Sequence, residues 1–114
     1  MIVLIFIAII CINKEANAFD HTTRGEPTCK DWIKDKNTPT EKENVSWIAG
    51  YVSGLAAVLS IENEIDLLKN ESINNLFGWT DEYCKRHPNE RISGPAEDYL
   101  FDILKQKKHV NSIN

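Results

Sequence analysis

Seventeen consecutive residues near the middle of the chain, 45–61, include no charged side chain. A helix that is apolar on every side is either buried inside a protein or crosses a membrane. Crossing a bilayer takes about 20 residues, whereas this segment has 17, contains three serines and is flanked by Glu43 and Glu62. We therefore expect it to be the buried central helix of a small bundle, ending at about Glu62, with a transmembrane helix as the alternative.

The start of this helix carries the strongest local signal in the sequence. Thr38 is a suitable N-cap, Pro39 suits the first helical position, and Glu41 follows at the spacing of a capping box. Further along the helix, Gly50 and Gly54 are four residues apart and have no side chain. We expect close packing at these glycines, either with a neighbouring helix or with a second subunit of a homodimer.

The N-terminus has the features of an export signal. Residues 2–12 form an uninterrupted apolar run, followed by the small residues Ala16 and Ala18 at the −3 and −1 positions of a cleavage site. These features predict a signal peptide over residues 1–18, a periplasmic location and no membrane attachment after cleavage. No Lys or Arg precedes the run, so either the signal is atypical or translation begins upstream. An uncleaved membrane anchor is the alternative.

Removal of residues 1–18 leaves 96 residues that contain two cysteines, Cys29 and Cys84. An exported domain matures in an oxidising compartment, where such a pair forms a disulfide. A disulfide that closes the loop between Cys29 and Cys84 stabilises a domain by about 4 kcal/mol in the chain-entropy model. Free or metal-bound thiols are the less favoured alternative, because neither cysteine has histidines nearby at the spacing of a zinc site. We expect one disulfide and no metal or cofactor.

Start and stop signals predict three further helices. Thr28 can cap a short helix that closes at Asn37, Ser72 can cap a third helix that ends before Pro88, and Gly94 opens the last one. No segment shows the alternation typical of strands. The predicted fold is all-α, a small four-helix bundle with one disulfide. Its organisation is a signal peptide (1–18), a flexible leader (19–27), a helical domain (28–109) and a tail (110–114).

The composition argues against two classes of function. A net charge of −4 repels phosphate backbones, so no nucleic-acid partner is expected. Nucleophilic catalysis needs a Cys or Ser beside a positioned His. The three histidines lie in the leader, at a helix end and in the last helix near its C-terminus, and both remaining cysteines are assigned to the disulfide. We therefore expect a protein-binding protein and not an enzyme.

Several short motifs occur in an order that resembles one protein family. They are Cys29-Lys-Asp-Trp32-Ile33, then Trp47-Ile-x-Gly50-Tyr51-Val52-Ser53-Gly54, then Ile73-x-x-Leu76-x-x-Trp79-x-Asp81-x-Tyr83-Cys84 followed by Pro88. This order resembles the Tai/Rap family of periplasmic immunity proteins, whose fold is similar to that of the acid-stress chaperone HdeA. The resemblance extends over residues 28–105.

The resemblance implies an exported, helical, disulfide-bonded and often dimeric protein. Such proteins bind and block peptidoglycan amidase effectors delivered by type VI secretion, by placing a rigid loop in the amidase cleft. On this chain we expect the charged loop 85–94 to have that role. An HdeA-like acid-stress chaperone and a structural envelope module are the alternatives. The candidate partner-binding residues are Arg86, His87, Asn89, Glu90 and Arg91.

Overall fold

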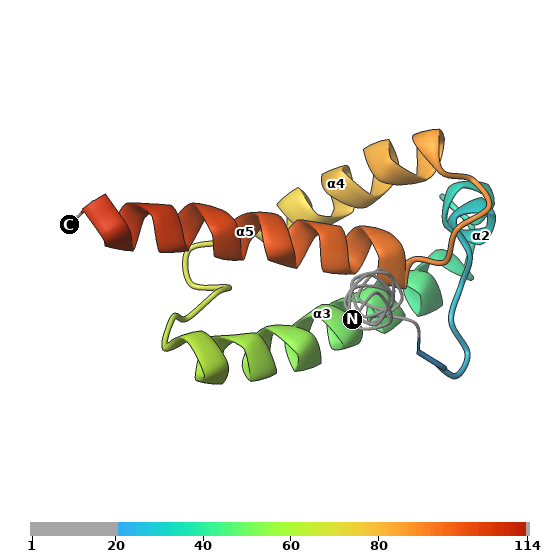
Figure 1. Ribbon diagram of the computed structural model, residues 1–114. Helices are drawn as coiled ribbons and strands as arrows, with labels where there is room; N and C mark the ends of the chain where they lie inside the picture. The colour runs from blue at the N-terminus through green and yellow to red at the C-terminus, as the bar shows by residue number, and fades with distance from the viewer. Residues whose placement is uncertain (1–20, 114) are drawn as a thin grey trace, which may run out of the picture.

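The computed structural model describes residues 21–113 (Figure 1). Its helices are α2 (Cys29–Lys34), α3 (Glu41–Asn63), α4 (Ile73–Arg86) and α5 (Ser93–Ile113), and no strand occurs among the described residues. The predicted all-α fold of four helices with one disulfide is therefore confirmed. The predicted signal peptide, 1–18, lies outside the described residues.

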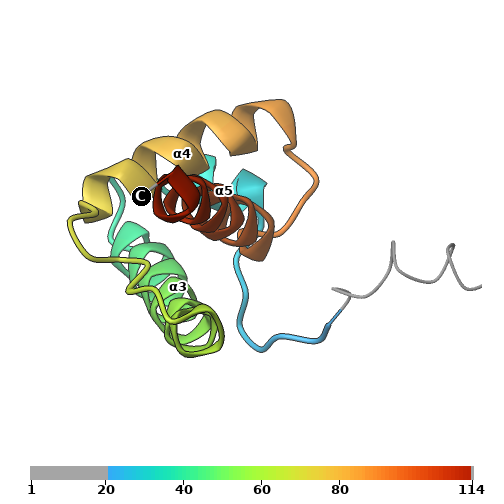
Figure 2. The same cartoon turned by 60° about the vertical axis from the view of Figure 1, so that its left-hand side comes forward.

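Helix α5 organises the bundle. It lies between α3 and α4 and packs against both, while the short α2 packs against α4 and α3 (Figure 2). It extends to Ile113, so residues 110–113, which were expected to form a tail, are helical. The core combines side chains from these helices with two from the connecting loops. The largest fully buried aliphatic side chains are Ile48, Leu67, Ile92 and Leu100.

Two of the predicted helix caps are confirmed. At α2, the Thr28 hydroxyl oxygen accepts a hydrogen bond from the Asp31 backbone N–H at 3.1 Å, and the Asp31 carboxylate accepts from the Thr28 backbone N–H at 3.0 Å. At α4, the Ser72 hydroxyl oxygen accepts from the Asn74 N–H at 3.2 Å. Helix α4 ends at Arg86, two residues before Pro88, as the proline predicts.

The capping box at α2 leads to a pH-dependent prediction. The hydrogen bonds from Thr28 lower the pKa of the Asp31 carboxyl below its ordinary value of 3.8. Because the folded pKa is depressed, this contribution to stability is present at neutral pH and is lost as the pH falls through the folded pKa. We expect Asp31→Asn, which keeps an acceptor oxygen on an exposed side chain, to lower the free energy of unfolding by about 0.3–0.5 kcal/mol at pH 7.

Urea unfolding of wild type and Asp31→Asn at pH 7 and near pH 2 measures this difference. The gap between the two proteins should shrink at the lower pH. A gap of equal size at both pH values would mean that the carboxylate charge does not stabilise α2.

Helix α3 begins at Glu41, two residues after Pro39, so its predicted start is wrong. The Thr38 hydroxyl donates to the Asp35 carbonyl oxygen at 2.5 Å. This bond closes the turn after α2, and the hydroxyl is therefore not used as the N-cap of α3. The Glu41 carboxylate does reach back, but it accepts from the Asn37 backbone N–H at 3.2 Å.

Helix α3 is buried on one face only, which corrects the expectation of burial on most sides. Its exposed side chains include Val58 and Ile61, which are 52% and 80% exposed. The reason is that α5 is its one long neighbour, and a six-residue α2 cannot cover the opposite face. The buried residues of α3 are Asn44, Ile48, Val52, Ala56 and Leu59.

Gly50 and Gly54 lie on the exposed face of α3. A side chain at either position would meet no atom within 4 Å, so neither glycine marks a close approach to another helix of this chain. Contact with a second subunit stays a prediction. By length and composition, α3 is also the one helix in residues 21–113 that could cross a membrane, and 22% of its most apolar window is buried.

The described part of the predicted flexible leader, residues 21–27, is bound to the helical domain. The Glu26 carboxylate accepts from the Ser93 backbone N–H at 2.7 Å, at the first turn of α5. The Trp47 indole N–H donates to the Arg24 carbonyl oxygen at 3.1 Å. This segment therefore belongs to the folded unit and connects α3 with α5.

Candidate functional site

The disulfide between Cys29 and Cys84 is confirmed, with 4.9 Å between the two Cα atoms. It joins the first residue of α2 to the last turn of α4, and both cysteines are fully buried. Helix α4 ends two residues after Cys84, at Arg86. The disulfide therefore fixes the point from which the charged loop leaves the bundle.

The loop between α4 and α5, residues 87–92, is held by backbone hydrogen bonds on its inner side. The Cys29 N–H donates to the Glu90 carbonyl oxygen at 2.7 Å, and the Ile92 N–H donates to the Pro27 carbonyl oxygen at 3.1 Å. The Ile92 side chain is completely buried. Backbone groups of Pro27 and Cys29, next to the disulfide, thus hold the loop in one conformation.

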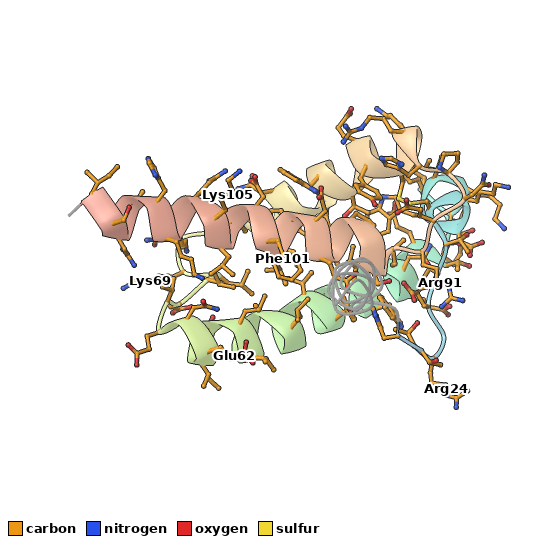
Figure 3. The ribbon with its side chains drawn as sticks, in the orientation of Figure 1. Arg24, Glu62, Lys69, Arg91, Phe101 and Lys105 are labelled. Carbon is orange, nitrogen blue, oxygen red and sulfur yellow. A yellow bond between two sulfur atoms is a disulfide. The ribbon has the colours of Figure 1, made fainter. Side chains whose placement is uncertain are left out.

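The end of α4 and the outer side of this loop carry the predicted partner-binding side chains. All of them are exposed, and Arg91, with a side chain 62% exposed, extends from the end of the molecule where α2 lies (Figure 3). The segment 64–72, which contains Lys69, lies at the opposite end. The structure brings the five candidates together at one end of the bundle: Arg86, His87, Asn89, Glu90 and Arg91.

The charged groups of the loop are paired locally. The Tyr83 hydroxyl donates to the Glu90 carboxylate, whose other oxygen lies 3.8 Å from His87 Nδ1. Burial, followed by this hydrogen bond to Glu90, raises the pKa of the Tyr83 hydroxyl. Arg91 Nη1 lies 4.0 Å from the Glu26 carboxylate, the side chain of which is 4% exposed. These contacts orient the side chains before any partner binds.

An open polar cleft of about 540 Å³ separates the loop from the N-terminal segment. Its walls are residues 21–23 on one side and residues 89–91 on the other, and Glu97 from the first turns of α5 also lines it. The Glu97 carboxylate accepts from the Tyr51 hydroxyl at 3.1 Å, and the His21 ring stacks on the Tyr51 ring. The cleft therefore extends the candidate binding surface beyond the loop.

Sequence reasoning misses this second cluster. His21, Tyr51 and Glu97 come from the leader, α3 and α5, and no spacing rule relates positions so far apart in the chain. The one available signal is Tyr51, which lies in the Gly-Tyr-x-x-Gly motif. Among the described residues, no group of three His, Cys, Asp or Glu side chains could hold a metal ion. The groups in this cleft offer hydrogen bonds and charge to a ligand.

The Glu97 carboxyl allows a test of this geometry. Burial raises its pKa above the ordinary 4.5, while the Tyr51 hydrogen bond and His21 act against that rise and Glu26 adds to it. A raised folded pKa means that the ionised group weakens folding at neutral pH. We expect Glu97→Gln, which keeps an acceptor for Tyr51, to raise the free energy of unfolding at pH 7 by up to about 1 kcal/mol.

This gain should disappear as the pH falls through the raised pKa, because the wild-type carboxyl is then neutral as well. Thermal unfolding from pH 7 to pH 4 measures it. A Glu97→Gln protein that is less stable than wild type by the same amount at every pH would show that burial of the Glu97 charge does not weaken folding.

Comparison of the chain with protein-family models, with curated proteins and with solved structures finds no match. The structure itself establishes the fold of the described residues as an all-α bundle of four helices with one disulfide. The likeness to the Tai/Rap family stands on the sequence motifs given above.

Proposed function

We propose that this protein is a periplasmic immunity protein that binds a peptidoglycan amidase effector of type VI secretion and inhibits it sterically. The observation that carries this proposal is the loop 87–92, which is exposed on its outer side and held by buried backbone hydrogen bonds on its inner side. The sequence motifs support the choice of an amidase as the partner.

A held loop suits an inhibitor because binding does not have to order it. Immobilising a flexible segment lowers affinity, and a segment already in its bound conformation avoids that cost. The end of α4 and the loop together present two arginines and one glutamate within six positions, Arg86, Glu90 and Arg91. Arginine at the centre of an interface frequently dominates binding energy. Residues 21–23 across the cleft enlarge the surface around the loop.

The experiment is an inhibition assay with the chain produced with its own residues 1–18 and recovered from the periplasm. N-terminal sequencing first tests cleavage after Ala18, which would leave Phe19 as the first residue. Purified type VI amidases then release dye-labelled fragments from sacculi in the presence of increasing amounts of this protein. We expect stoichiometric inhibition of one amidase. Absence of inhibition across the amidase classes would contradict the proposal.

Acid titration separates this function from that of an acid-stress chaperone. A chaperone of that kind must unfold or dissociate near pH 3 and expose apolar surface. The Asp31 and Glu97 carboxyl groups have pKa shifts in opposite directions, so protonation weakens folding at one and favours it at the other. We expect the protein to remain helical at pH 3 and to leave the aggregation of a client protein unchanged.

A further inference from the structure

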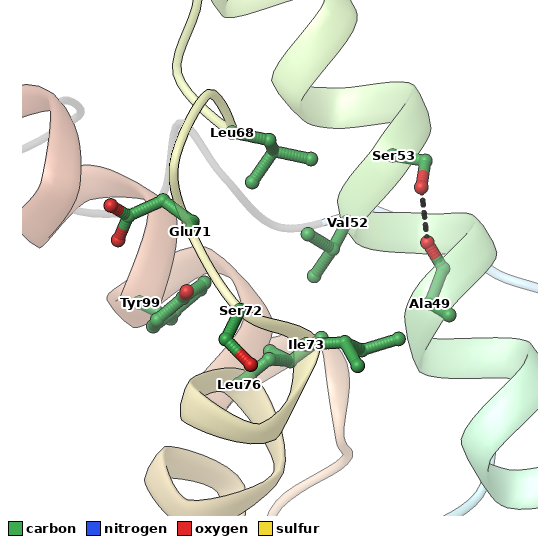
Figure 4. Close-up of a pocket in the computed structure, with 9 residues that line it drawn as sticks. All are labelled: Ala49, Val52, Ser53, Leu68, Glu71, Ser72, Ile73, Leu76 and Tyr99. Atoms are coloured by element: carbon green, nitrogen blue, oxygen red, sulfur yellow. Dashed lines mark hydrogen bonds between the residues drawn. The ribbon is translucent and has the colours of Figure 1, made fainter.

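A second concave surface shares no lining residue with the cleft beside the loop 87–92. It is a cavity of about 110 Å³ between α3, the start of α4 and the segment 64–72 (Figure 4). Val52, Leu68 and Leu76 supply apolar lining, and Tyr99 of α5 closes one side. The exposed Ser53 also lines the cavity, so it opens beside the uncovered face of α3.

A neighbouring cavity of about 260 Å³ continues this surface along α3. The two cavities share Ser53 and Leu68. Beyond them, the second cavity is lined by the small side chains Ala56 and Ala57 and then by Ser60. Together the cavities form one groove, which we call the α3 groove, with an apolar floor and a deeper pocket at one end.

The outer wall of the α3 groove is held in place. Lys107 of α5 donates from Nζ to three carbonyl oxygens of the segment 64–72, at 2.7 to 3.1 Å. The Leu67 backbone N–H donates to the Ser60 hydroxyl oxygen at 3.1 Å, and the Leu67 side chain is fully buried. The groove is therefore preformed and does not depend on a ligand to open it.

The charge around the α3 groove is mainly negative. Neither cavity is lined by a Lys or Arg side chain, whereas Glu71 lines the first and Asp66 lines the second. Glu62 and Glu64 lie next to this wall in the sequence, and Lys69 is the one cation between residues 62 and 72. The positive charge of Lys107 is directed at backbone carbonyls. The negative charge around the α3 groove attracts cationic partners and repels acidic ones.

We propose that the α3 groove binds a basic amphipathic segment of a partner protein. One apolar side chain of that segment enters the 110 Å³ pocket, a volume of the order that holds one aromatic ring or branched side chain. Further apolar side chains lie along Ala56 and Ala57, and lysines or arginines lie over Asp66 and Glu71. This is the helix-in-groove mode of recognition. It is independent of the loop 87–92 and does not rest on the amidase proposal.

Two designed peptides test this inference by isothermal titration calorimetry with the periplasmic protein. The first peptide has leucines on one helical face and lysines on the other. The second peptide has glutamates in place of the lysines. We expect saturable binding of the lysine peptide, weakened by added salt, and no binding of the glutamate peptide. Removing the two acidic charges of the α3 groove with Asp66→Asn and Glu71→Gln should lower the affinity for the lysine peptide about 3-fold at low salt.

A matched pair of substitutions on α3 locates the binding site. Ser53→Phe places a ring at the junction of the two cavities, both of which Ser53 lines, and should lower affinity for the lysine peptide at least about 10-fold. Ser46→Phe places the same ring on an exposed position of α3 that lines neither cavity, and should leave affinity unchanged. Circular dichroism and thermal unfolding confirm that both variants fold.

Three results would overturn the inference. The first is no saturable binding of either peptide to the wild-type protein. The second is binding of the lysine peptide that Ser53→Phe and Ser46→Phe reduce equally. The third is self-association in sedimentation that Ser53→Phe abolishes while no peptide binds, which would assign the α3 groove to a second copy of this chain.

Discussion

Replacement of Arg86, Glu90 and Arg91 by alanine should lower the affinity for the inhibited amidase at least about 100-fold. The exposed Arg86 ends α4, and Glu90 and Arg91 lie on the loop 87–92, whose inner side stays anchored because the anchoring bonds come from backbone atoms that alanine retains. The Tyr83–Glu90 hydrogen bond and the Arg91–Glu26 pair are lost, so the free energy of unfolding should fall by about 1–2 kcal/mol, which leaves the domain folded. The measurement is a titration of amidase activity with each protein, alongside urea unfolding of both.

A matched control separates the loop from the overall charge of the protein. The exposed Glu62 and Lys105 lie away from the loop (Figure 3), and the exposed Lys108 lies three residues further along α5. Replacement of these three residues by alanine also removes two cations and one anion. This control should inhibit the amidase as wild type does. If both triple variants lost inhibition equally, the effect would be due to net charge. The loop would then be excluded as the binding surface.

Replacement of Cys29 and Cys84 together by alanine should lower the free energy of unfolding by about 4 kcal/mol. Small domains have a total stability of about 5–15 kcal/mol. The urea concentration at the midpoint of unfolding should therefore fall by a large fraction. The disulfide connects the first residue of α2 to the last turn of α4, and α2 has only six residues with which to hold itself in the core. Urea unfolding followed by circular dichroism measures the loss.

A reductant supplies the control for this prediction. Reduction of the wild-type protein should reproduce the destabilisation of the double alanine variant to within about 1 kcal/mol, the uncertainty introduced by the small cavities that alanine leaves. The variant itself should not respond to the reductant. A wild-type midpoint that reduction leaves unchanged would show that the disulfide is not needed for the fold.

Much of the fold is predictable from local features of the sequence. Thr28 and Ser72 act as caps because a side-chain oxygen at a helix start needs only the next few backbone N–H groups. The pairing of Cys29 with Cys84 follows from their being the two cysteines outside the predicted signal peptide. Each of these predictions depends on residues that are close in sequence or on a pair that has no competitor.

The parts that escape prediction depend on which elements become neighbours. Uncharged residues occupy every side of α3 between positions 45 and 61, so its sequence does not indicate that Ile48 faces the core and Ile61 faces solvent. The packing of α5 against one side of α3 decides this. Likewise, the bond from Cys29 N–H to the Glu90 carbonyl oxygen joins backbone groups, which carry no side-chain signal in the sequence.

The same holds for the candidate site. The exposure of the loop side chains is predictable from the charges between Arg86 and Arg91, but the rigidity of the loop is not. It arises because Pro27, at the end of the expected flexible leader, accepts a backbone hydrogen bond from Ile92. Composition alone gives no reason to expect that a polar segment with Gly and Pro is bound to the fold.

Hydrogen exchange of the protein with and without the amidase that it is proposed to inhibit tests the central claim most directly. Peptides that cover residues 85–94 and the adjoining residues 21–24 should gain protection on complex formation, while those along α3 should not change. Protection confined to α3 or to the segment 64–72, with the loop 87–92 unaffected, would contradict the account and would move the inhibitory surface to the other end of the bundle.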